Sequence, residues 1–273
     1  MLTISNAITA AFALIMAPFR SYPVTGMIVI SVVTGVLMLL VYKYTSNQKG
    51  ITAAKNGIKA NFLAIMLFKD SLLVLFKSIG SILKWNLKYM GHNLKPLAVM
   101  IAPVLLLLVQ LNFWYGYRQF EPGEKALVDV RVAPQVNLAQ TPVQLETDKG
   151  VAVETPGVRI PKTGEIAWRI RAVEPGVHKL VVRVGDISSE KEFDVGKSDK
   201  LVRLSPLRHS GGFWDGLLYP GEPKLEGGIT SIRVEYPGAK MNIWRWHIHW
   251  IIVYFVLSIL AGLSMKGLFK VDI

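Results

Sequence analysis

The positions of the charged residues constrain this chain more than any other feature of its sequence. Three stretches of twenty or more residues contain no Asp, Glu, Lys or Arg: 21–42, 96–117 and 246–265. A basic residue flanks each stretch on both sides. Because a helix needs about 20 predominantly apolar residues to cross a hydrocarbon core of about 30 Å, each stretch is long enough to span a membrane. We therefore expect transmembrane helices at residues 21–43, 95–118 and 244–265.

The two segments between the predicted spans differ in charge. Residues 43–95 contain nine lysines and a single acid, Asp70, for a net charge of +8. Residues 118–245 contain 19 bases and 17 acids, so they are almost balanced. Positively charged loops remain cytoplasmic, whereas a long balanced domain can be translocated. This predicts an outer N-terminus and an outer domain at 119–243, with an inner loop at 44–94 and an inner tail at 266–273.

This topology explains most of the formal net charge of +12, because the surplus lysines lie beside the bilayer. We therefore expect lipid as a partner and no nucleic acid. The chain has no cysteine, which excludes disulfides and thiolate metal sites. The predicted location is the plasma (inner) membrane of a prokaryote, with the large domain on the periplasmic or extracellular side.

Residues 1–20 are apolar, but they have neither a basic n-region nor a signal-peptidase site. Ile4, Ile8 and Phe12 recur at helical spacing, and the polar residues of this segment lie off that stripe. We expect an amphipathic helix that lies in the plane of the outer membrane face.

The lysine-rich loop at 44–94 has apolar residues at spacings of three and four, as amphipathic helices do. A break near Lys69-Asp70 or at Gly80 would fold it into a hairpin of two helices. Such a hairpin either lies on anionic lipid or contacts a client protein or partner subunit. The candidate contact residues are Lys55, Lys59, Lys69, Lys77, Lys84 and Lys88.

The pattern changes to alternation of apolar and polar residues in the outer domain, which is typical of short antiparallel strands. A hairpin is predicted around Gly185-Asp186, between alternating runs on either side. The domain is large enough for one all-β, immunoglobulin-like sandwich. The predicted strands cover residues 126–132, 143–147, 164–172, 178–184 and 191–195.

A glycine-rich loop at 210–228 follows the strands and carries large apolar side chains. Such side chains in a flexible loop indicate either a membrane contact or a partner-binding surface. Together with aromatic residues at the outer ends of the second and third spans, they would form an aromatic belt. The members of this outer belt are Trp114, Phe213, Trp214, Tyr219, Trp244, Trp246 and Trp250.

The sequence contains no recognisable catalytic or cofactor motif, so we expect neither an enzyme nor a cofactor or metal site. The spacing of His247 and His249 resembles that of a pair of metal ligands. On a helix, however, side chains two residues apart diverge by about 200°, so the two would not bind one metal ion. His209 and Asp215 lie close in sequence to Ser210, as catalytic partners of a serine could. Ser210 does not lie in the glycine-flanked motif of a nucleophile elbow, so we do not expect a catalytic serine here.

The predicted spans contain few polar residues. A buried amide in a membrane must be hydrogen-bonded, so Gln110 and Asn112 should face protein or a wet cavity. These residues either form interhelical hydrogen bonds or line a hydrophilic groove between the spans. The candidate groove-lining residues are Thr34, Gln110, Asn112 and Ser258.

This arrangement resembles the YidC/Oxa insertase superfamily, and most closely its minimal three-span members, the archaeal YidC-like proteins and the related subunit of the endoplasmic reticulum membrane complex. The resemblance covers residues 1–117 and 246–273, with the second span passing Pro96 and Ile101-Ala102-Pro103-Val104 before Gln110-Leu111-Asn112-Phe113-Trp114-Tyr115. It implies a groove open to the cytoplasm, in which hydrophilic parts of a client are held while its apolar segment enters the lipid. The hairpin would help to receive the client.

Two functional hypotheses follow. The first is an insertase-like biogenesis factor or chaperone, which acts on membrane-protein clients through the groove and the hairpin. The second is a non-catalytic anchoring subunit of a larger hetero-oligomeric envelope complex, which binds its partners through the outer β domain.

Overall fold

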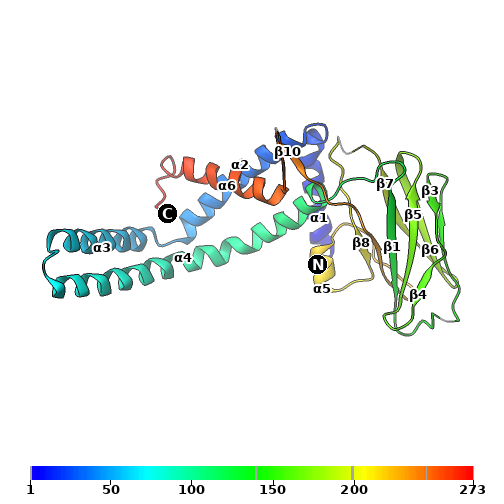
Figure 1. The fold of residues 1–273 in the computed structure, drawn as a ribbon, viewed down its shortest axis with the longest axis horizontal. Helices are drawn as coiled ribbons and strands as arrows, with labels where there is room; N and C mark the ends of the chain where they lie inside the picture. The colour runs from blue at the N-terminus through cyan, green and yellow to red at the C-terminus, as the bar shows by residue number, and fades with distance from the viewer. Residues whose placement is uncertain (1, 139, 198–199, 244, 273) are drawn as a thin grey trace. The chain divides into compact units, whose positions relative to one another are not determined.

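The computed structural model describes residues 2–138, 140–197, 200–243 and 245–272 (Figure 1). The chain forms two compact units. One comprises Met1–Gly26 and Leu108–Trp250, and the other comprises Met27–Leu107 and Ile251–Ile273. The first unit holds the β-sheets, and the second is entirely helical apart from its connections.

Two helices are long and apolar enough to cross a membrane: α2, Pro23–Thr45, and α4, Leu72–Tyr115. Pro23 suits the first position of α2, where its missing N–H costs no hydrogen bond. The third apolar helix, α6, covers only the 16 residues Trp250–Met265. At 1.5 Å per residue it is about 24 Å long, shorter than the hydrocarbon core of about 30 Å. Three spans thus remain a prediction.

The lysine-rich loop folds into two helices, α3, Gln48–Leu67, and the first part of α4 (Figure 1). Asn47 caps α3 by accepting a hydrogen bond of 3.0 Å from the Gly50 N–H. The chain turns around Lys69-Asp70, whereas Gly80 lies inside α4. The expected boundary at residue 95 is absent, because the second arm and the second apolar stretch form one continuous helix of 44 residues.

Glycines of α3 bring the two arms close together. A side chain at Gly57 would collide with the Trp85 ring, and one at Gly50 would collide with His92. Both pairs are seven residues apart on their own helix, which is two helical turns. The small residues of one helix therefore receive the large residues of the other, and this fixes the register of the hairpin.

Helices α2 and α6 also cross at small residues. A β-carbon at Gly35 would overlap the backbone carbonyl of Ser258, and Gly262 lies against the Gly35 carbonyl. Small residues at a crossing allow two apolar helices to approach closely, which is how helices associate in lipid. Gly35 is thus required by the packing rather than by its own backbone conformation.

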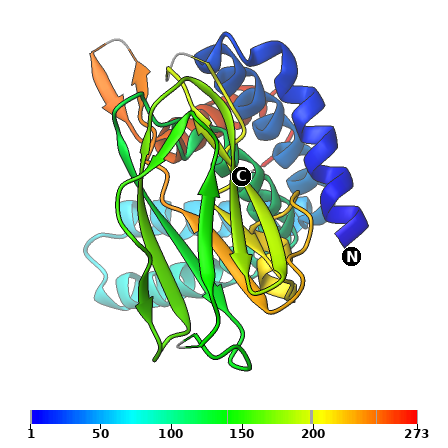
Figure 2. The same cartoon turned by 90° about the vertical axis from the view of Figure 1, so that its right-hand side faces the viewer.

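Two antiparallel sheets face each other in the segment 119–243, called the β domain from here on (Figure 2). One sheet has the strand order β3-β5-β1-β9-β8, with β4 also paired to β5, and the other has the order β2-β6-β7. The first sheet consists of β1 Lys125–Val132, β3 Val151–Val153, β4 Val158–Ile160, β5 Glu165–Ala172, β8 Leu207–His209 and β9 Ile229–Val234. The second consists of β2 Val143–Thr147, β6 Gly176–Val184 and β7 Ile187–Val195.

The five predicted strands are confirmed as β1, β2, β5, β6 and β7. Their inward residues form one hydrophobic core, in which Phe120 stacks on Phe193 with 5.1 Å between ring centroids. The predicted hairpin is also confirmed, since Val184 pairs with Ile187 and Gly185 has a φ of 59°. Positive φ at this position is favourable only for glycine-like residues.

The segment before α6 differs from expectation. It forms a two-stranded hairpin of β10, Met241–Ile243, and β11, Trp246–Ile248, so the third apolar helix begins at Trp250 and not at residue 244 (Figure 2). His247 therefore lies on a strand, paired with Asn242, and not at the start of a helix. If residues 246–248 were helical, the backbone groups of Met241–Ile243 would lose the hydrogen bonds that β11 provides.

Residues 1–20 form α1, Leu2–Met16, followed by the 3₁₀ turn Ala17–Phe19. Helix α1 contacts the short helix α5, Phe213–Leu218, of the β domain. Thr9 and Met16 are buried, whereas Leu14 is 78 % exposed. The N-terminal helix is thus an integral part of the same unit as the sheets, with one face left open.

Candidate functional site

A cavity of about 280 Å³ lies between α2, α4 and α6. Helix α2 contributes Thr34 and Met38, α4 contributes Met100, and α6 contributes Phe255 and Ser258. Two of the four candidate groove residues, Thr34 and Ser258, are thus brought together here. The remaining lining residues are Gly35, Leu39, Tyr42, Val104, Tyr254, Ile259, Gly262 and Leu263.

The polar groups of this cavity are largely occupied by one another. The Ser258 hydroxyl donates to the Tyr254 carbonyl at 2.7 Å, and the Tyr254 side chain is hydrogen-bonded to Thr34. Two turns further along α2, the Tyr42 hydroxyl donates to Asn93 Oδ1 of α4. The walls therefore offer mainly methionine, aromatic and aliphatic surface, which suits an apolar occupant better than a hydrophilic one.

The other two candidate groove residues lie elsewhere. Gln110 is buried and its amide donates to the Thr9 hydroxyl of α1 at 3.1 Å. Asn112 donates to the Tyr117 hydroxyl at 3.5 Å, near the end of α4. Both belong to the unit that contains the sheets. The Gln110–Thr9 bond joins α4 to α1 and so is an interhelical hydrogen bond of the kind expected as the alternative to a groove, whereas the Asn112–Tyr117 bond is local and does not join two helices.

The candidate lysines of the hairpin are not equivalent. Lys55 lies 3.9 Å from the Asp272 carboxylate, which also accepts a hydrogen bond from Thr52, so the C-terminal tail covers it. Lys88 lies over the Trp85 ring, 4.5 Å from its centroid. The remaining candidates are exposed, and they are Lys59, Lys69, Lys77 and Lys84.

Large apolar side chains are exposed around the turn of the hairpin. Leu67 is 75 % exposed, Leu73 is 78 % exposed and Phe76 is 71 % exposed. Phe62, Leu63, Met66, Phe68 and Leu72 are each more than half exposed as well. A contiguous apolar surface of this kind, with lysines at its borders, is typical of a protein or membrane contact.

The predicted aromatic belt is divided by burial. Trp114 and Trp250 are buried in the unit that contains the sheets, and Tyr219 packs edge-on against Phe113. Trp114 and Trp250 therefore do not belong to an exposed belt. Phe213, Trp214 and Trp246 are exposed, at 61 %, 68 % and 70 %. Trp244 lies outside the described residues.

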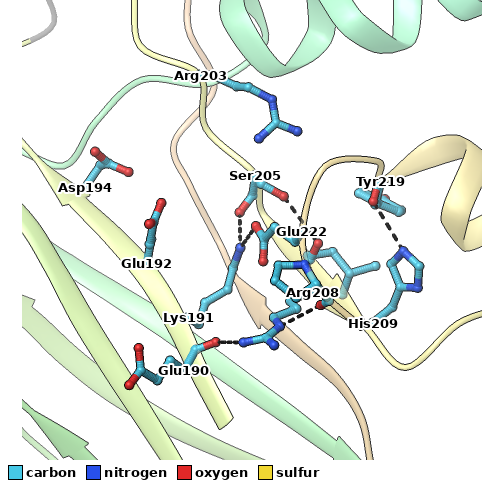
Figure 3. A network of polar contacts seen from close by, with 12 residues as sticks. Glu190, Lys191, Glu192, Asp194, Arg203, Ser205, Arg208, His209, Tyr219 and Glu222 are labelled. Carbon is cyan, nitrogen blue, oxygen red and sulfur yellow. Dashed lines mark hydrogen bonds and ion pairs between the residues drawn. The ribbon is translucent and has the colours of Figure 1, made fainter. Parts of the chain in front are cut away.

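A polar network holds the segment that carries the exposed aromatic pair (Figure 3). Lys191 of β7 donates to the Ser205 carbonyl at 2.7 Å and forms an ion pair with Glu222. Arg203 donates to the Pro220 carbonyl at 2.6 Å. Arg208 and His209 bond to further carbonyls of residues 219–224. The loop is therefore fixed to the sheets at several consecutive residues.

A polar cavity of about 280 Å³ adjoins this network and is also lined by Asp194 and Glu192. Burial lowers the pKa of Lys191, although Glu222 opposes this effect. Burial likewise lowers the pKa of Arg203. It raises the pKa of Asp194 to about 6, with a smaller contribution from Glu192. Each shift disfavours a buried charge, as expected where water is excluded.

Sequence reasoning missed this network, although β7 contains a signal for it. Strand residues two apart share a face, so Ser189, Lys191 and Phe193 all point to the inner side. A lysine in register with core residues is unusual and requires a buried partner. The partner, Glu222, is 31 residues away in sequence, and only the tertiary fold brings it close.

Among the described residues, no group of three or more His, Cys, Asp or Glu side chains is arranged to hold a metal ion. Comparisons with known proteins leave the family open, since no family model and no curated protein matches the chain. Among solved structures, the chain is similar to the crystal structure of the S-layer protein SbsC domains 4 and 5, with 20 % identity over 30 % of this chain and a TM-score of 0.24. The chain covers 48 % of that structure's length.

Proposed function

We propose that this protein is an insertase-like biogenesis factor or chaperone that receives an apolar segment of a membrane-protein client between its spans. The proposal includes three spans with the N-terminus outside and the C-terminus inside, and an immunoglobulin-like sandwich on the periplasmic or extracellular side of a prokaryotic inner membrane. The similarity in arrangement to the YidC/Oxa superfamily supports a role in membrane-protein biogenesis, but the site proposed here differs from the hydrophilic groove that the resemblance implies, because its lining is apolar.

The observation that carries the proposal is the apolar cavity between α2, α4 and α6. Its residues come from the second half of α2 and from the turns of α4 that follow Lys95. With the lysine-rich hairpin inside the cell, these are the cytoplasmic halves of the spans. A volume of about 280 Å³ accommodates one or two large apolar side chains but no hydrated polar segment. The client part that binds here is therefore apolar.

The exposed apolar surface around the hairpin turn provides a first contact for the same client. Phe76 and Leu73 would bind an apolar segment before it reaches the bilayer, and the bordering lysines would hold the hairpin near anionic lipid. Lys55 lies beside the C-terminal tail instead, 3.9 Å from the Asp272 carboxylate.

Site-specific photocrosslinking in living cells tests this function. A photoreactive amino acid at Met38 or Met100 would face the cavity, whereas the matched positions Leu37 and Leu105 are more than half exposed on the same helices. We expect the cavity positions to crosslink to several newly synthesised, pulse-labelled membrane proteins, and the controls to show no such products. Crosslinks confined to one stable, stoichiometric species would contradict client handling.

A second candidate function is that of an anchoring subunit of an envelope complex. It is favoured by the exposed pair Phe213 and Trp214, whose loop is bonded to the rest of the domain at residues 219–224. Rigid aromatic side chains of this kind are common anchors of protein interfaces. Copurification of a partner with the full-length protein, lost in a Phe213→Ser/Trp214→Ser variant, would support it. Purification of the wild-type protein without any partner would rule it out.

A further inference from the structure

The C-terminal tail, residues 266–272, links the end of α6 to the first turns of α3 (Figure 1). The Asp272 N–H donates to Gln48 Oε1 at 2.8 Å, and the Asp272 carboxylate accepts a hydrogen bond of 2.6 Å from the Thr52 hydroxyl. The Lys55 ammonium lies 3.9 Å from the same carboxylate. Because these three residues of α3 are spaced four and three apart, they share one face of the helix, and that face receives Asp272.

Two further features hold the tail in this position. Val271 is only 7 % exposed, although most residues around it are exposed, and its N–H donates to the Lys266 carbonyl at 3.0 Å. Lys270 has a φ of 51°, in the left-handed region that is unfavourable for residues other than glycine. A residue keeps such a conformation only where its surroundings hold it. The tail is thus anchored at Val271 and Asp272 and strained at Lys270.

Tyr42 connects the tail with the apolar cavity between α2, α4 and α6. Its side chain lines that cavity, together with Leu263 of α6. Its hydroxyl donates to Asn93 Oδ1 of α4, and the Asp272 carboxylate is close enough to act on it electrostatically. All these residues belong to the helical unit. The tail therefore adjoins the end of the cavity at which Tyr42 and Leu263 lie.

The cavity as it stands is too small for the client segment proposed above. Its volume of about 280 Å³ holds one or two large apolar side chains, whereas a helix with its side chains is about 10 Å across. Entry of such a segment requires α6 to move away from α2 and α4. A tail bonded to α3 opposes this movement, because it ties the end of α6 to the hairpin.

We propose that residues 266–272 form a clasp that holds this cavity closed and that leaves α3 before a client segment enters. This proposal rests on the client-handling function proposed above and supplies its regulation. The bonds of the clasp to α3 converge on Asp272, so they break together. Exposed hydrogen bonds and ion pairs contribute little net stability, because water competes for them, so the clasp can open at small cost.

Distances between spin labels, measured by pulsed electron paramagnetic resonance on the full-length protein in lipid nanodiscs, test the clasp without any client. Labels on Tyr44→Cys and Ser264→Cys report the separation of the ends of α2 and α6. Both positions are exposed, and the chain has no other cysteine. We expect the ratio of open to closed molecules to rise about tenfold in Asp272→Ala, as for the loss of one hydrogen bond to a charged group.

Asp70→Ala is the matched control, because Asp70 is the other acidic residue of the helical unit and is exposed at the hairpin turn. It should leave the distances unchanged. Identical distance distributions in Asp272→Ala and in the protein with native Asp272 would overturn the clasp, whatever the protein does with clients.

Reversible locking tests whether the clasp controls entry. In Thr52→Cys/Asp272→Cys, a short bis-methanethiosulfonate reagent joins the tail to α3, and the two single variants treated in the same way are the controls. With a photoreactive amino acid at Met38, we expect client crosslinks in membrane vesicles to disappear on locking and to return on reduction. Crosslinks that persist in the locked protein would overturn the clasp as the control of entry. Absence of client crosslinks from the unlocked protein would contradict the proposed function, and the spin-label distances would still decide whether the tail holds α6.

Discussion

Replacement of Asp194 by asparagine should stabilise the β domain at neutral pH. Burial raises the pKa of Asp194 from its ordinary value of 3.8 to about 6. The native state therefore binds a proton more tightly than the unfolded chain, so this contribution is most favourable below about pH 4 and is lost as the pH rises through about 6. Since a difference of one in pKa corresponds to about 1.36 kcal/mol, the ionised carboxylate costs at most about 3 kcal/mol at neutral pH.

Asparagine has a similar shape and no charge to desolvate, so Asp194→Asn should remove this cost. Hydrogen exchange of the β6 amides in the full-length protein, corrected for intrinsic rates, measures the free energy of opening of the domain. We expect the variant and the wild type to agree near pH 4 and to differ by up to about 3 kcal/mol at about pH 7.5.

Asp186→Asn is the matched control, because Asp186 is exposed at the neighbouring hairpin turn. It should leave the pH dependence of exchange unchanged. If Asp194→Asn and wild type showed the same opening free energy at every pH, the argument that burial controls this carboxyl would be refuted.

Two further predictions concern packing and ion pairing. Gly35→Leu should destabilise the helical unit by more than the cost of about 1–3 kcal/mol that is typical of overpacking, because the Ser258 backbone cannot move aside. Gly80→Leu, at an open position, should not destabilise it in this way. Thermal unfolding in detergent compares the two variants. Lys191→Met should cost about 3–5 kcal/mol by leaving the Glu222 carboxylate without its partner, and Lys191→Met/Glu222→Gln should recover most of that loss in urea unfolding. Equal stability of the single and double variants would show that the pair is not coupled.

Local pattern predicted much of the secondary structure. Alternation of apolar and polar residues identified β1, β2, β5, β6 and β7, because inward residues of a sandwich strand must be apolar. It missed β3, β4 and β8, which have only three residues each and too few positions to establish a period. It also missed the longer strand β9, which directly follows the glycine-rich loop. The β10–β11 hairpin was missed for a different reason, since its aromatic residues adjoin an apolar helix and extended the apparent helical pattern.

The candidate sites were less predictable than the strands. Thr34 and Ser258 do line one cavity, but Gln110 bonds to Thr9 in the other unit. Position along a predicted span gives no information about which side of a helix faces a neighbour. That side depends on where small residues such as Gly35 allow another helix to approach.

The sequence by itself determined the structural elements that depend on local composition and on the spacing of apolar residues. These are the long apolar helices, the lysine-rich helical hairpin, whose turn the pattern left open between Lys69-Asp70 and Gly80, and the alternating strands of the β domain. The tertiary structure alone decided which distant residues meet. Lys191 reaches Glu222, and the Trp114 indole is buried without an acceptor, because side-chain burial and pairing depend on contacts between segments that no local pattern records.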